Sequence, residues 1–146
     1  MSSNKNVIPF NDEGQKHGLL KIYYSNGKLY HQGNYVNGEL HGNWKCFHEN
    51  GQLLNNGRYV NGKRDGYFEN YFDDGQLFYK GTYVNGKSHG YFEKYHFNGQ
   101  LHYKGNYIKG KRHGYFECYY YTGNISYKGY YNMDNRVNDE VVIAEE

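Results

Sequence analysis

The glycine residues constrain this chain more than any other feature, because all of them obey one period. The 20 glycines form four series that begin at Gly14, Gly18, Gly27 and Gly33 and advance by 24 residues without insertion. A fixed period in this range is typical of a repeat array in which each repeat is one supersecondary unit. The sequence therefore predicts five copies of one unit, at residues 14–37, 38–61, 62–85, 86–109 and 110–133.

The composition indicates what can fill the interior of such an array. The chain holds 20 tyrosines, 8 phenylalanines and a single proline, and its mean hydropathy is −1.08. Aliphatic side chains are too few for a large two-layer core, so aromatic rings must supply most of the buried area. Disordered chains are poor in aromatic residues, so this composition favours a folded domain.

Charge and cysteine content restrict the partners and the compartment. The net charge of +2 is too small to indicate a nucleic-acid partner. Cys46 and Cys118 occupy the same repeat position three repeats apart, or about 29 Å apart at two strands of about 4.8 Å per repeat, so they cannot form a disulfide. The sequence opens with no signal peptide and has no apolar run of membrane length. We therefore expect a cytoplasmic protein, with peripheral attachment to a membrane left open.

Turn signals divide each repeat into two strands. Asn26-Gly27 and its equivalents mark one set of turns, and Asn37-Gly38 and its equivalents mark the other. Asn-Gly between alternating aromatic residues favours a type I′ hairpin, since that turn needs positive φ at both central residues. No helical periodicity competes. The predicted fold is all-β, a single elongated, twisted antiparallel sheet of consecutive hairpins with about ten or eleven strands, about 50 Å long at about 4.8 Å per strand.

A two-residue loop at Asn98-Gly99 sets the predicted register. Counting outward from it gives the pairs His96–Leu101, Lys94–Tyr103, Glu93–Lys104, Phe92–Gly105 and Gly90–Tyr107. The equivalent ion pairs in neighbouring repeats are Glu69–Lys80 and Glu117–Lys128. Where lysine replaces glutamate the opposed residue is neutral, so like charges never meet, which supports the register. A glycine opposed to an aromatic residue predicts a ring lying over bare backbone, on a concave apolar face.

Both ends depart from the repeat. In residues 1–13 the apolar run Val7–Phe10 can cover the first strand edge, and Met1–Asn6 is expected to fray. Residues 134–146 retain a degenerate repeat without glycine, in which Val141–Ala144 can pair as a last strand and acidic neighbours discourage further pairing. Atypical terminal repeats of this kind commonly cap an array.

The repeated pattern Tyr-Lys-Gly-x-Tyr-x-x-Gly-Lys-x-His-Gly stands at Tyr79–Gly90 and Tyr103–Gly114. It resembles the MORN repeat, and the Gly-Tyr-Phe-Glu-x-Tyr continuation is similar to a bacterial branch of antitoxin-like MORN variants. The resemblance covers residues 14–133. It implies a groove-shaped sheet of hairpins, protein–protein contact and, in some members, phospholipid binding. Two departures stand out: Gly-Tyr-Phe or Gly-Asn-Trp replaces the family's Gly-x-Gly, and tyrosine replaces its frequent tryptophan.

Two sets of residues are candidates for binding. The first consists of aromatic residues along the apolar groove: Tyr35, Tyr59, Tyr83, Tyr107, Tyr131, Phe68, Phe92, Phe116 and Trp44. The second consists of basic residues directly after turns, which this register leaves unpaired and available to an acidic partner or an anionic lipid: Arg64, Lys87, Lys111 and Arg112. Tyrosine rows on either face could also stack sugars or bases, although packing and cover are the simpler interpretation of these rings.

No set of residues in the sequence indicates a metal site or a catalytic site. His17, His41, His89 and His113 recur about 9.6 Å apart, two strand spacings, whereas zinc ligands lie about 2 Å from one ion. A hydrogen-bonded turn element explains them better. A catalytic site needs a unique set of nucleophile, base and orienting group, whereas here each reactive type recurs by translation. No enzymatic activity, metal or cofactor is predicted.

The sequence thus favours a non-enzymatic platform or scaffold that binds another protein. A rigid, preformed surface loses little freedom on binding. Three alternatives stay open at this point: peripheral binding to anionic phospholipid membranes, antitoxin-like neutralisation of a partner protein, and assembly into a homodimer.

Overall fold

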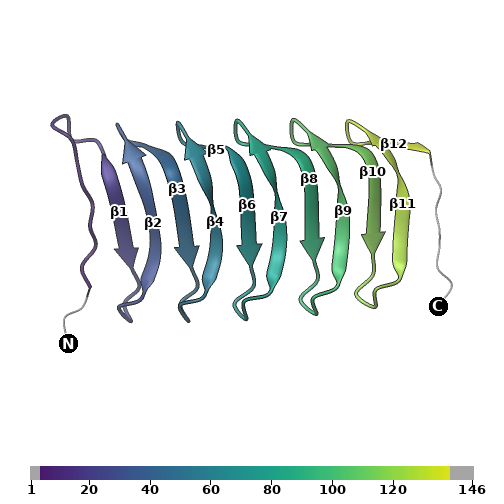
Figure 1. Cartoon of the computed structure of the whole chain (residues 1–146), viewed down its shortest axis with the longest axis horizontal. Helices are drawn as coiled ribbons and strands as arrows, with labels where there is room; N and C mark the ends of the chain where they lie inside the picture. The colour runs from purple at the N-terminus through teal and green to yellow at the C-terminus, as the bar shows by residue number, and fades with distance from the viewer. Residues whose placement is uncertain (1–3, 139–146) are drawn as a thin grey trace.

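The computed structural model describes residues 4–138, and within them the chain forms one sheet and no helix. The strands are β1 (Gly18–Tyr23), β2 (Leu29–Val36), β3 (Glu39–Phe47), β4 (Leu53–Val60), β5 (Lys63–Arg64), β6 (Gly66–Tyr71), β7 (Leu77–Val84), β8 (Lys87–Tyr95), β9 (Leu101–Ile108), β10 (Lys111–Tyr119), β11 (Ile125–Asn132) and β12 (Asn135–Asn138). Apart from β5, each strand pairs with the next in antiparallel fashion, β4 pairing with β6, and they stand side by side along the long axis (Figure 1).

The predicted open antiparallel sheet of consecutive hairpins is therefore confirmed. The sheet has 12 strands in the described part of the chain, of which the two-residue β5 pairs only with β4 and lies off the main path. In repeats two, four and five the equivalent of β5 runs on into the following strand, within β3, β8 and β10. Asp65, which stands where the other repeats carry histidine, separates β5 from β6.

The turns along the upper edge in Figure 1 have the predicted type I′ geometry. Asn85 and Gly86 both have positive φ, at 52° and 82°, and the equivalent residues of the other turns agree. The last of these turns keeps the geometry without glycine, since Met133 and Asp134 have φ of 49° and 72°. Asparagine and glycine recur there because other residues adopt this conformation only at a cost.

The loops along the lower edge are longer than predicted, and the type I′ assignment is wrong for them. Asn98 does not have positive φ, whereas Gly99 does, at 86°. His96 donates its backbone N–H to Gln100, 2.8 Å away, and accepts from Gly99 at 2.9 Å. This is a three-residue loop, a type I turn followed by a glycine bulge. It pairs Tyr95 rather than His96 with Leu101, and the register from Lys94 onward is as predicted.

A second irregularity lies beyond each upper turn. Tyr83 pairs with Ser88, but Gly81 pairs with Phe92, so β8 carries two extra residues at the bulge. Gly90, within the bulge, has φ of 100°. Because the shift is two residues, the alternation of side chains between the faces is preserved.

The N-terminal segment lies along the outer edge of β1. Val7 and Lys21 exchange backbone hydrogen bonds of 2.8 and 2.9 Å. The Asn6 carboxamide accepts from the backbone N–H of Tyr23 at 2.9 Å, and Asn4 donates to the carbonyl of Gly27 at 3.1 Å. The expected fraying is wrong for these two asparagines, which are held by hydrogen bonds. Residues 1–3, and the strand expected at Val141–Ala144, lie outside the described residues.

The buried core is a row of aromatic rings that lie over glycines, as predicted, but over different glycines. A Cβ added to Gly81 would come within 2.4 Å of the Phe92 ring. Phe92 pairs with Gly105 within its own hairpin and with Gly81 of the preceding one. The ring leans onto Gly81, and the nearest atoms over Gly105 belong to Phe116. Each hairpin is thus packed onto the one before it.

Candidate functional site

One face of the sheet carries a continuous ladder of aromatic rings, here called the aromatic face. It is made of Trp44, Tyr59, Phe68, Tyr83, Phe92, Tyr107, Phe116 and Tyr131. Successive rings meet edge to face, with centroids 5.2 to 6.1 Å apart. This arrangement suits the ring quadrupole and adds to the stabilisation from buried area. Tyr35 lies beyond the ladder, under the Lys16 ammonium.

The members of the ladder differ in what they offer to a partner. Phe68, Phe92 and Phe116 are buried, with 1%, 6% and 2% of their surface exposed, and Tyr131 is equally buried. These four groove candidates serve packing in the free protein. The remaining candidates, Tyr35, Tyr59, Tyr83, Tyr107 and Trp44, are half-buried and keep part of each ring accessible.

Two hollows interrupt the aromatic face at equivalent places in successive repeats. The first, of about 300 Å³, is lined by Phe78, Tyr79, Tyr83, Phe92, Lys94 and Tyr103. The second, of about 190 Å³, is lined by Tyr103, Tyr107, Arg112, Phe116, Cys118 and Tyr131. Four of the first six positions recur 24 residues later in the second, and Tyr103 forms the wall between them.

Both cysteines belong to this face and are free thiols. Cys46 is buried, and Cys118 lines the second hollow. Burial raises the pKa of both thiols, which keeps them protonated and poorly nucleophilic. They therefore serve as small packing residues.

The candidate cations fall into two groups. Arg64 lies over the rings of Phe68 and Tyr83, 5.2 and 5.0 Å from their centroids, and donates to the Tyr83 hydroxyl at 3.1 Å. Arg112 is paired with Asp134, Nε to Oδ1 at 3.1 Å. The prediction that these two arginines are unpaired is wrong, because Arg64 contacts two aromatic rings of the sheet and Arg112 forms an ion pair with Asp134.

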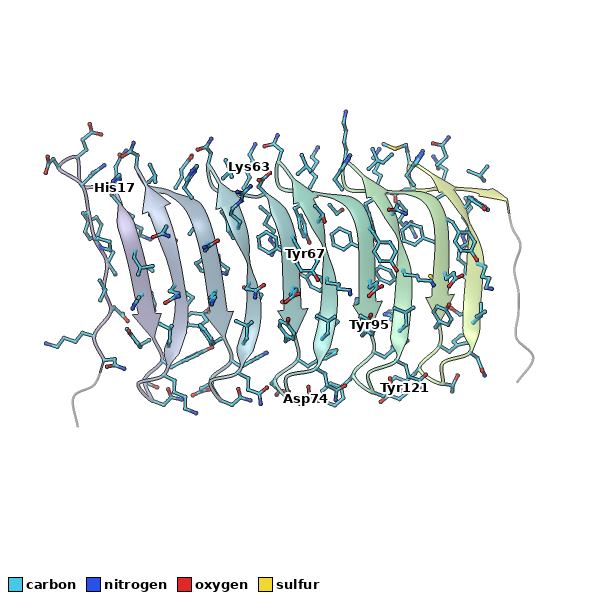
Figure 2. The ribbon with its side chains drawn as sticks, viewed as in Figure 1. His17, Lys63, Tyr67, Asp74, Tyr95 and Tyr121 are labelled. Atoms are coloured by element: carbon cyan, nitrogen blue, oxygen red, sulfur yellow. The ribbon has the colours of Figure 1, made fainter. Side chains whose placement is uncertain are left out.

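The lysines of the upper edge are more accessible. Lys87 and Lys111 are exposed, as predicted, and Lys63 occupies the equivalent place one repeat earlier (Figure 2). The side chain of Lys63 runs beside Gly86 of the next turn, and that of Lys87 runs beside Gly110. They form a row of cations along one edge of the array.

The histidines act as turn elements. The Nδ1 atoms of His17, His41 and His89 accept from backbone N–H groups of the following upper turn at 3.3 to 3.4 Å. The described residues contain no group of three side chains placed to hold a metal ion. The hydrogen-bonded role is confirmed for these three histidines, with the partner lying in the next turn rather than close in sequence. It is wrong for His113, whose buried Nδ1 atom has no hydrogen-bond partner within the described residues.

The opposite face carries a feature that the sequence interpretation passed over. In repeats three to five a glutamate stands between two tyrosines on one strand, as in Tyr91, Glu93 and Tyr95 of β8. The Tyr91 hydroxyl donates to Oε1 of Glu93 at 2.8 Å and the Tyr95 hydroxyl to Oε2 at 2.5 Å. The set Tyr67, Glu69, Tyr71, Tyr91, Glu93, Tyr95, Tyr115, Glu117 and Tyr119 is called the tyrosine–glutamate face. The spacing Tyr-x-Glu-x-Tyr was the available signal.

These hydrogen bonds change the acidity of both partners. The bond from Tyr119 lowers the pKa of Glu117, and burial, which acts in the opposite direction, does not cancel it. The same bond raises the pKa of Tyr119 to about 12. Burial and the Glu93 carboxylate likewise raise the pKa of Tyr95 to about 12. At neutral pH Glu93 and Glu117 are therefore ionised acceptors, and Tyr95 and Tyr119 are neutral donors.

The lysines of this face pair across hairpins rather than within them. Glu93 and Lys104 are opposed in the register, as predicted. The ammonium of Lys104, however, lies 3.1 Å from the carboxylate of Glu117, and that of Lys80 lies 3.3 Å from Glu93. Lys80 and Lys104 thus reach the glutamate of the following hairpin, so the partners predicted for these two lysines are wrong.

These observations define the class of protein: a single-layer array of β-hairpins whose surfaces are rows repeated from unit to unit. The chain belongs to the MORN repeat family. The family model described as MORN repeat variant matches residues 16–37, 40–61, 64–85, 88–109 and 112–133. No curated protein sequence matches the chain. MORN repeats are associated with protein or membrane binding, and theirs is not a family of enzymes. Within residues 4–138 there is no helix that could cross a membrane.

Proposed function

We propose that this protein is a non-enzymatic platform that binds another protein along its aromatic face. The observation that carries the proposal is the pair of hollows, which repeat at the same place in successive hairpins. Both are walled by tyrosine rings, which offer large contact area with few rotatable bonds. A partner segment that inserts one apolar side chain into each hollow would bury hot-spot contacts at the centre of the surface.

The ring ladder supports this proposal because it holds the accessible tyrosine rings in fixed positions. Tyr83 and Tyr107 are each held edge to face between two phenylalanine rings. Rings fixed in this way are already ordered before binding, so a partner loses little affinity to the ordering of the surface. The buried phenylalanines contribute through this preorganisation and not through direct contact.

The test is to fill the hollows and ask whether partners are lost. Lys94→Tyr and Cys118→Tyr place a ring in the first and second hollow, at strand positions where tyrosine is favoured. Tagged wild-type and double-variant proteins are used to capture partners from source lysate, with circular dichroism as the check on folding. The matched control is Tyr67→Ala on the opposite face. A folded double variant that captures the same partners as wild type would refute the proposal.

One particular partner is a cognate toxin, as the antitoxin-like resemblance implies. Co-expression with a toxic neighbouring gene would show relief of toxicity by the wild type and not by the double variant. Relief by both proteins would remove the aromatic face from that role.

A second candidate function, binding to anionic membranes, is favoured by the row of Lys63, Lys87 and Lys111. These side chains are exposed at one edge and spaced about 9.6 Å apart, two strand spacings. A basic residue near an anionic surface contributes about 1 kcal/mol, and salt weakens the effect. Co-sedimentation with phosphatidylserine vesicles tests this candidate, with the triple lysine-to-glutamate variant as comparison. Absence of co-sedimentation at low salt would eliminate it.

A further inference from the structure

The tyrosine–glutamate face presents tyrosine side chains that lean along the strands. Residues two apart on a strand are about 6.7 Å apart, and the Tyr91 hydroxyl spans that interval to reach Glu93. Tyr95 reaches back to the same carboxylate from the other side. A ring standing upright on the sheet could not make this bond, so both rings lie down along β8. Tyr115 and Tyr119 repeat the arrangement around Glu117 on β10.

The most exposed of these rings form a straight row across the strands. Tyr67, Tyr91 and Tyr115 keep 51%, 46% and 39% of their surface exposed. They recur on every second strand, about 9.6 Å apart at about 4.8 Å per strand. Figure 2 shows Tyr67 on β6 and, at the other tyrosine position, Tyr95 on β8. Repeats one and two lack this row, because Leu19 and Asn43 stand at the equivalent positions.

Polar side chains alternate with the rings. The cross-strand partners of Tyr67 and Tyr91 are Thr82 and Asn106, which therefore share their face. The partner of Tyr115 is Tyr130, whose ring centroid lies 5.3 Å from that of Tyr115. Within the described residues no protein group bonds the Thr82 hydroxyl or the Asn106 carboxamide. Beside the row, Glu93 accepts from two tyrosines and Lys80, and a carboxylate has about four acceptor sites. Around Tyr67 and Tyr91, rings thus alternate with groups that can still form hydrogen bonds.

The charge of this face selects among ligands that stack on rings. Next to the tyrosine row, the opposed residues are Glu69 with Lys80, Glu93 with Lys104, and Glu117 with Lys128. Acids and bases therefore balance. Affinity for a nucleic acid comes largely from excess cations that meet its phosphates, and this strip offers none. The same argument disfavours an anionic lipid on this face. The balanced charge of this face therefore favours a ligand without net charge.

We propose that the tyrosine–glutamate face binds an extended, uncharged β-linked polysaccharide along the row Tyr67, Tyr91 and Tyr115. Such a chain is straight, exposes the flat C–H faces of its sugar rings, and carries hydroxyl groups along both sides. Its length per two sugars is close to the spacing of the tyrosines, so one tyrosine stacks under every second sugar. Thr82, Asn106 and the glutamates meet the hydroxyls. The site lies on the face opposite the hollows proposed to bind a protein, so the two proposals fail independently.

The experiment is a pull-down of the full chain on insoluble cellulose and on chitin, with starch granules as the α-linked control. We expect retention on at least one β-linked polymer, release by its soluble hexasaccharide, and no retention on starch. Tyr91→Ala together with Tyr115→Ala is expected to weaken binding at least tenfold. Tyr91→Phe should keep most of the affinity, because it retains the ring. Circular dichroism and urea unfolding show that each variant is folded.

Matched controls separate ring stacking from general adhesion. Asn43→Ala changes the equivalent position of a repeat without the tyrosine row, and Tyr83→Ala changes a ring on the aromatic face. Neither is expected to alter retention. The proposal is overturned if wild type is retained on neither cellulose nor chitin, or if the Tyr91 and Tyr115 double variant binds as tightly as wild type. Equal loss from Tyr91→Phe and Tyr91→Ala would also overturn it, since the ring would then not be the source of binding.

Discussion

The contact between Phe92 and Gly81 yields a quantitative prediction about how the hairpins hold together. Gly81→Ala adds a methyl group whose carbon would lie 2.4 Å from two ring carbons of Phe92. Carbon atoms in favourable contact are about 3.5 to 4.0 Å apart, so the ring must move by about 1 Å or more. Phe92 is 6% exposed and has rings of Tyr83 and Tyr107 on either side, so a shift of its ring disturbs the contacts with both.

The expected cost is that of overpacking a buried site, about 1–3 kcal/mol. The backbone contributes nothing to this cost, because Gly81 does not have positive φ. In a Phe92→Ala background the obstacle is gone, and the same substitution should cost less than about 0.5 kcal/mol, as for independent sites. The predicted coupling between the two positions is therefore about 1–3 kcal/mol.

Urea unfolding followed by circular dichroism measures this cycle, with wild type, both single variants and the double variant compared at one temperature. Gly66→Ala is the matched control. Gly66 has φ of 92° and nothing within 4 Å of an added Cβ, so its cost is a backbone cost and should not depend on Phe92. A Gly81→Ala protein as stable as wild type, or a cost unchanged by Phe92→Ala, would refute the ring-over-glycine account.

Three further predictions concern the ion pairs, a turn and acid stability. A double-mutant cycle should find a coupling of about 0.2–1 kcal/mol between Lys104 and Glu117 and a smaller one between Lys104 and Glu93, and the reverse order would contradict the cross-hairpin pairing. Lys109 has φ of 49°, so Lys109→Asn should stabilise by about 1 kcal/mol, and an unchanged urea midpoint would count against this. The folded state lowers the Glu117 pKa, so the carboxylate stabilises above its unfolded pKa of about 4.3 and this stabilisation is lost as pH falls through the folded value. Glu117→Gln should therefore reduce the loss of stability in acid, which urea midpoints across that pH range would show.

Most of the fold could be predicted from the sequence because the residues that indicate turns and strand pairing recur from repeat to repeat. The upper turns follow from asparagine and glycine, which tolerate positive φ. The register of the hairpin around Phe92 follows from the position of its loop and from the need to place glycine under an aromatic ring. The lower loops were assigned wrongly because Asn-Gly also suits the end of a three-residue loop, where only the glycine needs positive φ.

The choice between two neighbouring strands could not be predicted, and the reason is symmetry. In a translational repeat every interior strand has one neighbour within its hairpin and another in the adjacent hairpin, with the same residue types. Glu93 lies beside Lys104 on one side and Lys80 on the other. Lys45, which stands at the glutamate position of its repeat, meets a neutral residue on both sides, Gln32 and Asn56, so its pairing fits both choices equally. Only the direction in which each side chain leans decides, and that direction is a property of the three-dimensional sheet.

At several levels of the sheet the lean crosses from one hairpin to another, backward along the array for Phe92 and forward for Lys104, His89 and Asn98. Phe92 covers the glycine of the hairpin before it, and Lys104 reaches the glutamate of the hairpin after it. His89 accepts from the backbone of the following upper turn, and Asn98 donates to a carbonyl of the following lower loop. The contacts that order each hairpin are thus supplied largely by its neighbours, as in other linear arrays. A binding surface built this way extends over several repeats, so its affinity should depend on rows of equivalent residues more than on any single one.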